Sequence, residues 1–136
     1  MKVGFTGTRH SMTINQAETL KEMLEKLSVT ELHHGDCIGA DAQAHKIAKE
    51  IGLKVVLHPP TDHKWRAFCQ ADKEREAKPY LLRNQDIVDE TDMLMAAPQT
   101  KEEQKKSGTW STVRYARKKQ KPLVLVFGED DAADVS

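Results

Sequence analysis

The sequence of 136 residues lacks the features that mark several classes of protein. Its two cysteines, Cys37 and Cys69, form no CxxC pair, so the pattern suggests no disulfide framework. No apolar run approaches the roughly 20 residues of a membrane-spanning helix. The first residues read as a strand and not as a signal peptide. We therefore expect a cytoplasmic protein without a membrane partner.

Three widespread catalytic and binding signatures are also missing. The sequence contains no GxxxxGK[ST], no GxGxxG and no GxSxG, so ATP hydrolysis, standard dinucleotide binding and esterase chemistry lack their motifs. His33, His34 and Cys37 lie close together, but neighbouring residues of a strand point to opposite faces. His33 and His34 are therefore not expected to share one ion, and we expect neither a metal site nor a cofactor.

The composition that remains suits one globular domain, with 38% hydrophobic and 31% charged residues. The net charge is zero but unevenly distributed: residues 129–136 hold four acids and no base, and residues 101–121 hold eight Lys or Arg against two Glu. We expect a domain over residues 1–128 and a disordered acidic tail over 129–136. The basic segment suits an anionic ligand or nucleic acid, and equally a solvated helix surface.

Strand and helix patterns alternate along the chain. Short apolar runs predict strands at 2–7, 30–35, 54–60, 92–98 and 122–128. Helical spacing predicts helices at 14–27, 40–52, 80–91 and 109–120, and residues 61–79 form an irregular excursion or a candidate lid. Strands separated by helices pair in parallel, and right-handed crossovers place helices on both faces. The predicted fold class is α/β: a single Rossmann-like doubly wound parallel sheet of about five strands with helices on both faces.

Glycines and small polar residues follow the predicted strands. Sheets of this kind bind ligands at the carboxyl ends of their strands. Glycine admits close approach of a ligand to the backbone, and a helix N-terminus favours phosphate. The candidate ligand-binding residues at these ends are Gly7, Thr8, Arg9, Gly35, Asp36, Gly39, Ala40, Asp41, Ser107, Gly108 and Thr109. Ser107, Gly108 and Thr109 form a candidate phosphate cradle, although Gly and Thr also begin many helices that bind nothing.

Two arginines are candidates for gripping a phosphate. A guanidinium binds phosphate through two parallel hydrogen bonds, and Arg9 and Arg83 both stand near predicted strand ends. For Arg83 the alternative is a buried structural pair with Asp86 or Asp92.

Two acids and two residues of the last helix complete the candidate site. We expect Asp41 to cap the second helix and Asp36 to accept hydrogen bonds from ribose hydroxyls. Trp110 is a candidate for stacking on a base. Thr112 lies one turn beyond Thr109, on the same helix face, and is expected to reach the same ligand.

Four stretches of the chain, in order, resemble the SLOG superfamily: GFTGTR, HHGDCIGADAQAHKIAKEIG, LLRNQDIVDETDMLMAAP and SGTWSTVRYARKKQKPLVLV. The resemblance covers residues 2–127, and its most specific parts are the Gly35–Ala44 stretch and the pair Arg83 and Asn84. The superfamily includes lonely-guy phosphoribohydrolases, molybdenum-cofactor carrier-like proteins, YspA-type proteins and the DNA-processing protein A family. It implies a Rossmann-like fold, a nucleotide or nucleotide-derived ligand at the strand ends, in contact with Arg83 and Asn84, and a homodimer or homotetramer.

The sequence departs from the phosphoribohydrolase branch at a decisive position. The pattern of that branch is Pro-Gly-Gly-x-Gly-Thr-x-x-Glu. In this sequence the position of the Glu is occupied by Thr112, which cannot act as a carboxylate base. The resemblance therefore favours a non-catalytic binder of a nucleotide-derived small molecule, acting as sensor, carrier or sequestering protein. The alternatives are a nucleoside monophosphate N-glycosidase, whose catalytic residues stay unknown, and, less favoured, a nucleic-acid binder of the DNA-processing type.

Overall fold

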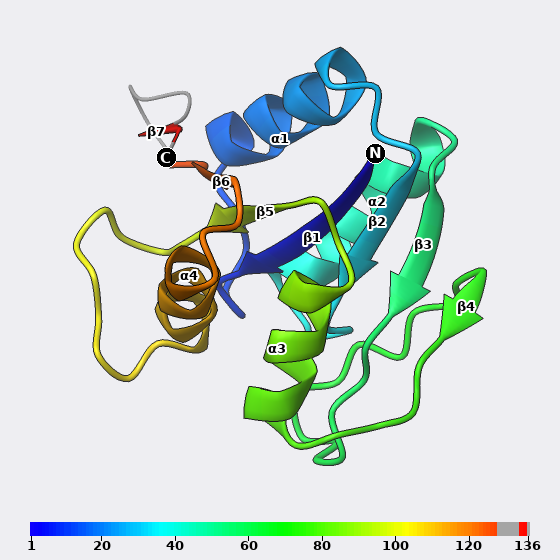
Figure 1. Ribbon diagram of the computed structural model, residues 1–136. Helices are drawn as coiled ribbons and strands as arrows, with labels where there is room; N and C mark the ends of the chain where they lie inside the picture. Colours follow the sequence, from blue (N-terminus) through cyan, green and yellow to red (C-terminus); the bar gives the residue numbers. More distant parts are fainter. Residues whose placement is uncertain (128–133, 136) are drawn as a thin grey trace.

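The structure is a computed structural model that describes residues 1–127 and 134–135 (Figure 1). The strands are β1 (Lys2–Gly7), β2 (Glu31–His34), β3 (Lys54–Leu57), β4 (Lys73–Glu74), β5 (Met93–Ala97), β6 (Leu123–Leu125) and β7 (Asp134–Val135). The helices are α1 (Ile14–Lys26), α2 (Ala40–Glu50), α3 (Tyr80–Asp89) and α4 (Gly108–Lys118).

The strands form one sheet in the order β4-β3-β2-β1-β5-β6-β7. Every pair is parallel except β6 with β7, which is antiparallel. The predicted α/β fold with a doubly wound parallel sheet is confirmed. The sheet has one more parallel strand than the five predicted, because residues 61–79 contribute β4. The direction of strand order reverses at β1, which lies between β2 and β5.

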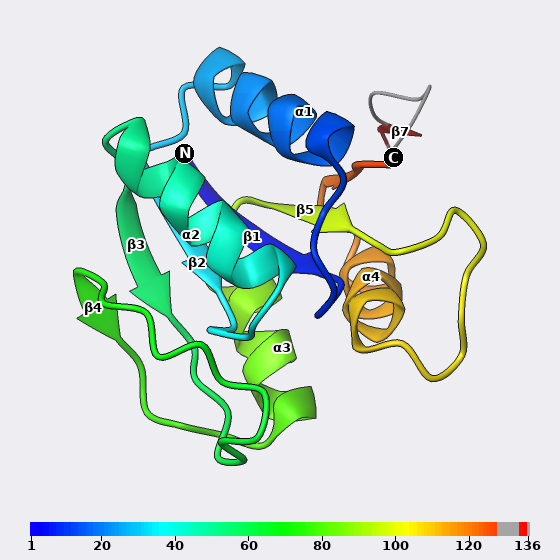
Figure 2. The ribbon, with the colours of Figure 1, turned by 180° about the vertical axis from the view of Figure 1, so that it is seen from behind.

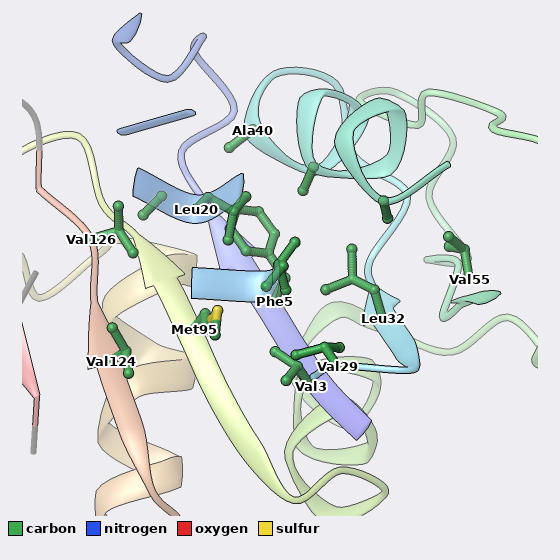
Figure 3. Packing of buried hydrophobic residues seen from close by; sticks show 14 of the residues in the cluster. Val3, Phe5, Leu20, Val29, Leu32, Ala40, Val55, Met95, Val124 and Val126 are labelled. Carbon is green, nitrogen blue, oxygen red and sulfur yellow. The ribbon is translucent and has the colours of Figure 1, made fainter. Parts of the chain in front are cut away.

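Helices cover both faces of the sheet, with α1 and α2 on one side and α3 and α4 on the other (Figures 1 and 2). On the first side, apolar residues of β1, β2 and β5 pack against α1 and α2, and Phe5, Leu20 and Leu32 are fully buried (Figure 3). On the second side, Ile87 of α3 and Val113 of α4 pack against β5 and β6. All five residues of β5 are buried, as expected for a strand covered on both faces.

A capping box between Thr13 and Gln16 fixes the start of α1. The Thr13 side chain accepts a hydrogen bond from the Gln16 amide at 3.1 Å, and the Gln16 side chain accepts one from the Thr13 amide at 3.0 Å. The Gln16 side-chain amide also donates to the carbonyls of Pro98 and Val126. Gln16 therefore ties α1 to the ends of the β5 and β6 segments.

The excursion of residues 61–79 runs beside β3 and the strand ends. Its short strand β4 pairs in parallel with β3, and the Arg75 amide donates to the Leu57 carbonyl at 2.9 Å. The Thr61 amide closes the segment on itself by donating to the Lys78 carbonyl at 3.1 Å. The expected acidic tail at 129–136 lies outside the described residues except for β7, so its predicted disorder stays a prediction.

Candidate functional site

A cavity of about 420 Å³ opens at the carboxyl ends of β1 and β2, where the strand order reverses. The first turns of α3 and α4 close two of its sides. Most of the residues predicted from the sequence line it, namely Gly7, Thr8, Arg9, Gly35, Asp41, Arg83, Asn84, Ser107, Gly108 and Thr109. Sequence reasoning missed other lining residues, including Cys37, Trp65, Tyr80, Gln99, Gln104 and Lys106. Several of them come from loops whose path the sequence pattern does not predict.

Arg83 is the buried cation of the cavity wall, with 5% of its surface exposed. Its Nη1 donates to the carbonyls of Gly35 and His58, and its Nε donates to the Asn84 side chain at 2.7 Å. Its Nη2 has a weak contact, the Cys37 sulfur at 3.7 Å. A Cβ on Gly35 would overlap the guanidinium, so glycine here lets the Arg83 side chain lie against the backbone. The protein thus holds one edge of the guanidinium by backbone carbonyls and leaves Nη2 with a weak partner.

Neither carboxylate considered as an ion-pair partner for Arg83 takes that role. Lys78 pairs with Asp86 at 2.6 Å, and Asp92 accepts a hydrogen bond from the Lys2 amide at 2.7 Å. Among the described residues, no carboxylate forms an ion pair with Arg83. A buried charge that no carboxylate pairs with directly is only partly compensated, so this guanidinium is suited to an anion in the cavity.

Asp41 is the acid of the cavity wall and is 6% exposed. Its Oδ2 accepts hydrogen bonds from the amides of Gly35 at 3.1 Å and Cys37 at 3.2 Å, whereas its Oδ1 has no hydrogen-bond partner among the described residues. Burial raises the pKa of Asp41 to about 6, against the lowering effect of the nearby Arg83 charge. The predicted cap of α2 is not formed, because Gly39 occupies the N-cap without a side-chain hydrogen bond. Asp41 instead holds the loop between β2 and α2.

Asp36 does not line the cavity, and its predicted contact with ribose is not available. It is fully buried, and its Oδ2 accepts a hydrogen bond from Arg66 Nε at 2.7 Å. Its Oδ1 accepts one from the Cys69 amide at 2.9 Å. Both partners belong to the 61–79 excursion, so Asp36 fastens that excursion to the end of β2.

The start of α2 is closed by the protein itself. Gly39 has a φ of +86°, and a Cβ there would overlap the Arg9 carbonyl. The Ala40 amide donates to the Thr8 carbonyl at 2.9 Å, and a Cβ on Gly7 would press on the Ala40 side chain. Gly39 and Ala40 therefore do not reach the cavity. At Gly7 and Gly39 the missing side chain leaves room for other parts of the protein, where the sequence suggested a ligand.

The start of α4 is open. The Ser107 hydroxyl caps the helix by accepting a hydrogen bond from the Trp110 amide at 3.3 Å. A Cβ on Gly108 would meet nothing within 4 Å, and Gly108 is exposed on the cavity wall. Thr109 lines the cavity beside it. The first turn of a helix leaves amides without intrahelical partners, so this start keeps the geometry predicted for a phosphate cradle.

Two predicted residues of α4 do not face the cavity. Trp110 is 3% exposed and packs in the apolar cluster with Ile87 and Val113, where it cannot stack on a ligand base. Thr112 is buried, and its hydroxyl donates to the Gly108 carbonyl at 2.9 Å. Thr109 and Thr112 lie on the same face of α4, but this face lines the cavity only at Thr109 and is buried in the protein at Thr112.

Two aromatic side chains line the cavity instead. Trp65 forms part of the cavity wall, with the Arg9 guanidinium 4.5 Å from its ring centre. Within the part of the chain that the structure describes, the Tyr80 hydroxyl is buried without a hydrogen-bond partner. Burial raises the pKa of Tyr80, which keeps its hydroxyl protonated and able to donate. Trp65 offers a stacking surface, and Tyr80 offers a donor.

The loop before α4 supplies no catalytic carboxylate to the cavity. Glu103 pairs with Arg114 at 2.8 Å, and Glu102 is exposed and outside the lining. Among the lining residues, Asp41 is the one carboxylate.

Potential metal ligands gather elsewhere in the part of the chain that the structure describes. One group is His33, His58 and Glu90, and the other is His34, His45 and Cys69. His33 and His34 fall in different groups, as strand alternation requires.

Comparison with known proteins identifies the fold. No protein-family model matches the sequence, and no curated protein matches it. The molybdenum cofactor binding protein from Rippkaea orientalis is similar in structure, with a TM-score of 0.72 and 20% identity over 94% of this chain and 77% of that one. DNA processing protein A from Helicobacter pylori has a TM-score of 0.68 and 22% identity over 98% of this chain and 68% of that one.

A third similar structure is the molybdenum cofactor carrier protein from Chlamydomonas reinhardtii. Its TM-score is 0.65, with 23% identity over 93% of this chain and 77% of that one. The chain therefore has a SLOG-like fold, as its sequence resemblance implied. Within the described residues, no helix is long and apolar enough to cross a membrane.

Proposed function

We propose that the cavity binds a nucleotide or nucleotide-derived small molecule without cleaving it, so that the protein acts as a sensor, carrier or sequestering protein. One observation carries the proposal: the buried Arg83 lacks an ion-pair partner among the described residues, and it lines the same cavity as the unpartnered Oδ1 of Asp41. An anion beside Arg83 and a hydrogen-bond donor beside Asp41 would satisfy both groups at once.

The anionic end of the ligand lies between Arg83 and the start of α4 in this proposal. Arg83 Nη2 and the first-turn amides of α4 are donors, and the helix dipole adds positive potential at the same place. Lys106 lines the cavity next to this helix start and adds a cation. These groups suit a phosphate.

The other end of the ligand carries hydrogen-bond donors and a flat ring. Asp41 Oδ1 accepts from a ribose hydroxyl or a base N–H, and the Tyr80 hydroxyl donates to an oxygen or ring nitrogen. Trp65 supplies the stacking surface, with Arg9 on its ring. The cavity volume of about 420 Å³ falls within the usual range for small-molecule sites. Two of the similar folds bear the names of molybdenum cofactor proteins, which supports a small-molecule ligand.

A second candidate function is cleavage of a nucleoside monophosphate, and Asp41 is the observation in its favour. A carboxyl with a pKa of about 6 is suited to general acid–base catalysis near neutral pH. The absence of a second carboxylate from the lining residues favours binding over cleavage. DNA binding finds support only in the basic residues at 101–121 and in the likeness to DNA processing protein A.

The test is a thermal-shift screen of nucleotides and nucleotide-derived cofactors, followed by titration of each stabilising compound. A true ligand raises the free energy of unfolding by RT ln(1 + [L]/Kd). Arg83→Gln should weaken binding by at least about tenfold, because it removes the cation proposed to hold the anionic end of the ligand, and a hydrogen bond to a charged group is worth about 1.5–3 kcal/mol. Arg114→Gln is the matched control, since Arg114 lies on α4 outside the cavity lining.

Three outcomes decide between the functions. Binding without release of free base supports the proposal. Release of free base by the wild type, abolished in Asp41→Asn, establishes the hydrolase. Binding of single-stranded DNA, with no nucleotide stabilising the protein, refutes the small-molecule site.

The predicted homodimer or homotetramer is proposed on one further feature. Leu81 and Leu82, at the start of α3, are 64% and 52% exposed. Neighbouring exposed leucines suit self-association, and light scattering of the purified protein measures it.

A further inference from the structure

We propose that His33, His58 and Glu90 form a binding site for a divalent transition metal such as Zn²⁺. One ligand atom from each residue lies within 4.8 Å of the other two. Two imidazoles and a carboxylate form a common zinc-binding set that leaves one coordination position open. The site is separate from the ligand cavity, so it does not depend on the function proposed above.

The backbone holds the two histidines rigidly. His33 belongs to β2, and His58 follows directly on the neighbouring strand β3. The His58 amide donates to the His34 carbonyl at 2.8 Å, which extends the ladder to this position. Both imidazoles are almost fully buried, at 1% and 2% exposure. Ligands on adjacent strands of a sheet are preorganised for an ion.

Hydrogen bonding leaves one nitrogen of His33 free to bind a metal. His33 Nε2 lies 2.7 Å from Glu31 Oε1, an acceptor, so Nε2 carries the proton and Nδ1 carries a lone pair. A carboxylate that fixes the tautomer of a ligating histidine is the usual outer partner in metal sites. That Nδ1 lies 2.8 Å from His58 Nε2.

The same hydrogen bonds leave a nitrogen of His58 without a proton on the side that faces the negative carboxylate of Glu90. If His58 Nε2 donates to His33, the neutral ring has no proton on Nδ1, and this nitrogen lies 4.0 Å from Glu90 Oε2. A metal ion bound to His58 Nε2 removes the conflict, because the ring proton moves to Nδ1 and Glu90 Oε2 turns from Nδ1 to the positive charge of the ion. Arg75 holds the other oxygen, Glu90 Oε1, at 2.9 Å, so Oε2 is the oxygen that can turn.

Little movement is needed to admit the ion. Two Zn–N bonds of about 2.0–2.1 Å at a tetrahedral angle place the nitrogens about 3.3 Å apart. The His33 and His58 nitrogens therefore have to separate by roughly half an ångström from their 2.8 Å contact. Glu90 is about one-third exposed, so its side chain has room to turn toward the ion.

The second histidine group does not offer the same chemistry. The Asp36 amide donates to His34 Nδ1 at 2.9 Å, so the ring proton of His34 stays on Nε2 and points to His45 Nδ1 at 3.0 Å. Neither nitrogen of His34 has a free lone pair. Burial and the Asp36 carboxylate raise the pKa of Cys69 to about 12, which opposes formation of the thiolate that a metal binds. His45 and Cys69 therefore provide matched controls.

The experiment is a titration of chelator-treated protein with Co²⁺, followed by visible absorption, and competition with Zn²⁺. We expect one equivalent of Co²⁺ to give d–d bands without a thiolate charge-transfer band. His58→Gln should abolish binding, and Glu31→Gln should weaken it by about 10–100-fold through loss of the outer partner. His45→Gln should leave it unchanged.

Glu90→Gln serves as the second variant if His58→Gln fails to fold, because Glu90 is partly exposed. It should weaken Co²⁺ binding by at least about tenfold. A thiolate charge-transfer band, or loss of binding in His45→Gln, would assign the metal to the other group and overturn the proposal. Equal binding by wild type and both His58→Gln and Glu90→Gln would show an adventitious ion only, and no binding at millimolar Co²⁺ would also refute the site.

Discussion

Two helices begin beside a glycine at the same edge of the sheet, yet their surroundings are opposite. At α2, a Cβ on Gly39 would overlap the Arg9 carbonyl, and the Ala40 amide is taken by the Thr8 carbonyl. At α4, a Cβ on Gly108 would meet nothing within 4 Å, and the residue lines the cavity. A glycine at a helix start therefore indicates space for close approach, and the tertiary structure decides whether protein or ligand fills it.

The largest expected effect tests the closed start. Gly39→Ala should lower the free energy of unfolding by about 4 kcal/mol, because a non-glycine residue in strained backbone costs about 1–3 kcal/mol and overpacking costs a similar amount. Urea unfolding followed by circular dichroism measures it. Gly108→Ala is the matched control and should change stability by no more than about 0.5–1 kcal/mol. Equal losses in the two variants would show that the two starts do not differ.

The next effect separates the two acids that flank the start of α2. Asp36→Asn should lower the free energy of unfolding by about 3 kcal/mol, since it removes the buried partner of Arg66 and leaves only the 3.2 Å pair with the exposed Glu74. Asp41→Asn should leave stability at pH 7 unchanged or higher, because the amide oxygen still accepts from Gly35 and Cys37 and the buried charge is gone. Thermal and urea unfolding of both variants provide the comparison. A stable Asp36→Asn and a collapsed Asp41→Asn would reverse these roles.

A smaller effect concerns the pH dependence of stability at Asp41. Its folded pKa is about 6, raised from an ordinary value of 3.8, so the folded state keeps a proton that the unfolded state releases between these values. The contribution of Asp41 to stability is therefore present below about pH 4 and is lost as the pH rises through about 6. A pKa shift of about two units corresponds to roughly 2–3 kcal/mol. No such titrating group lies in the Ser107–Thr109 cradle.

The pH effect has to be read against the wild type because other groups titrate in the same range. Burial lowers the pKa of His58 to about 3, so its contribution to stability rises with pH over this window, opposite to that of Asp41. Subtracting the wild-type curve from that of Asp41→Asn cancels the histidines. We expect the advantage of Asp41→Asn to grow between pH 4 and pH 7, and a difference that stays flat would contradict the raised pKa.

The smallest effect tests the open start. Ser107→Ala should lower the free energy of unfolding by about 1 kcal/mol, because it removes the hydroxyl that accepts from the Trp110 amide. Ser107→Thr keeps a hydroxyl and should restore most of the loss. A stability unchanged by Ser107→Ala would mean that this cap is not formed in solution.

Much of the fold was predictable because it depends on local patterns. Apolar runs and helical spacing identify the strands and the four helices, and their alternation requires a parallel sheet. The 61–79 excursion was not predictable as a strand, because Lys73 and Glu74 carry no strand pattern of their own. They are extended because the edge of β3 offers hydrogen bonds to them.

For the candidate site, the sequence by itself determined that polar residues and glycines meet at one edge, because parallel strands end together. Only the tertiary structure decided which of them face the cavity. Asp36 and Asp41 lie five positions apart in one motif. Asp36 pairs with Arg66 of a distant loop, whereas Asp41 keeps one oxygen without a partner among the described residues. His33, His58 and Glu90 are likewise brought together only by strand pairing and the crossover through α3. Contacts of this kind depend on how loops and strands pack across long sequence separations, which no local spacing encodes.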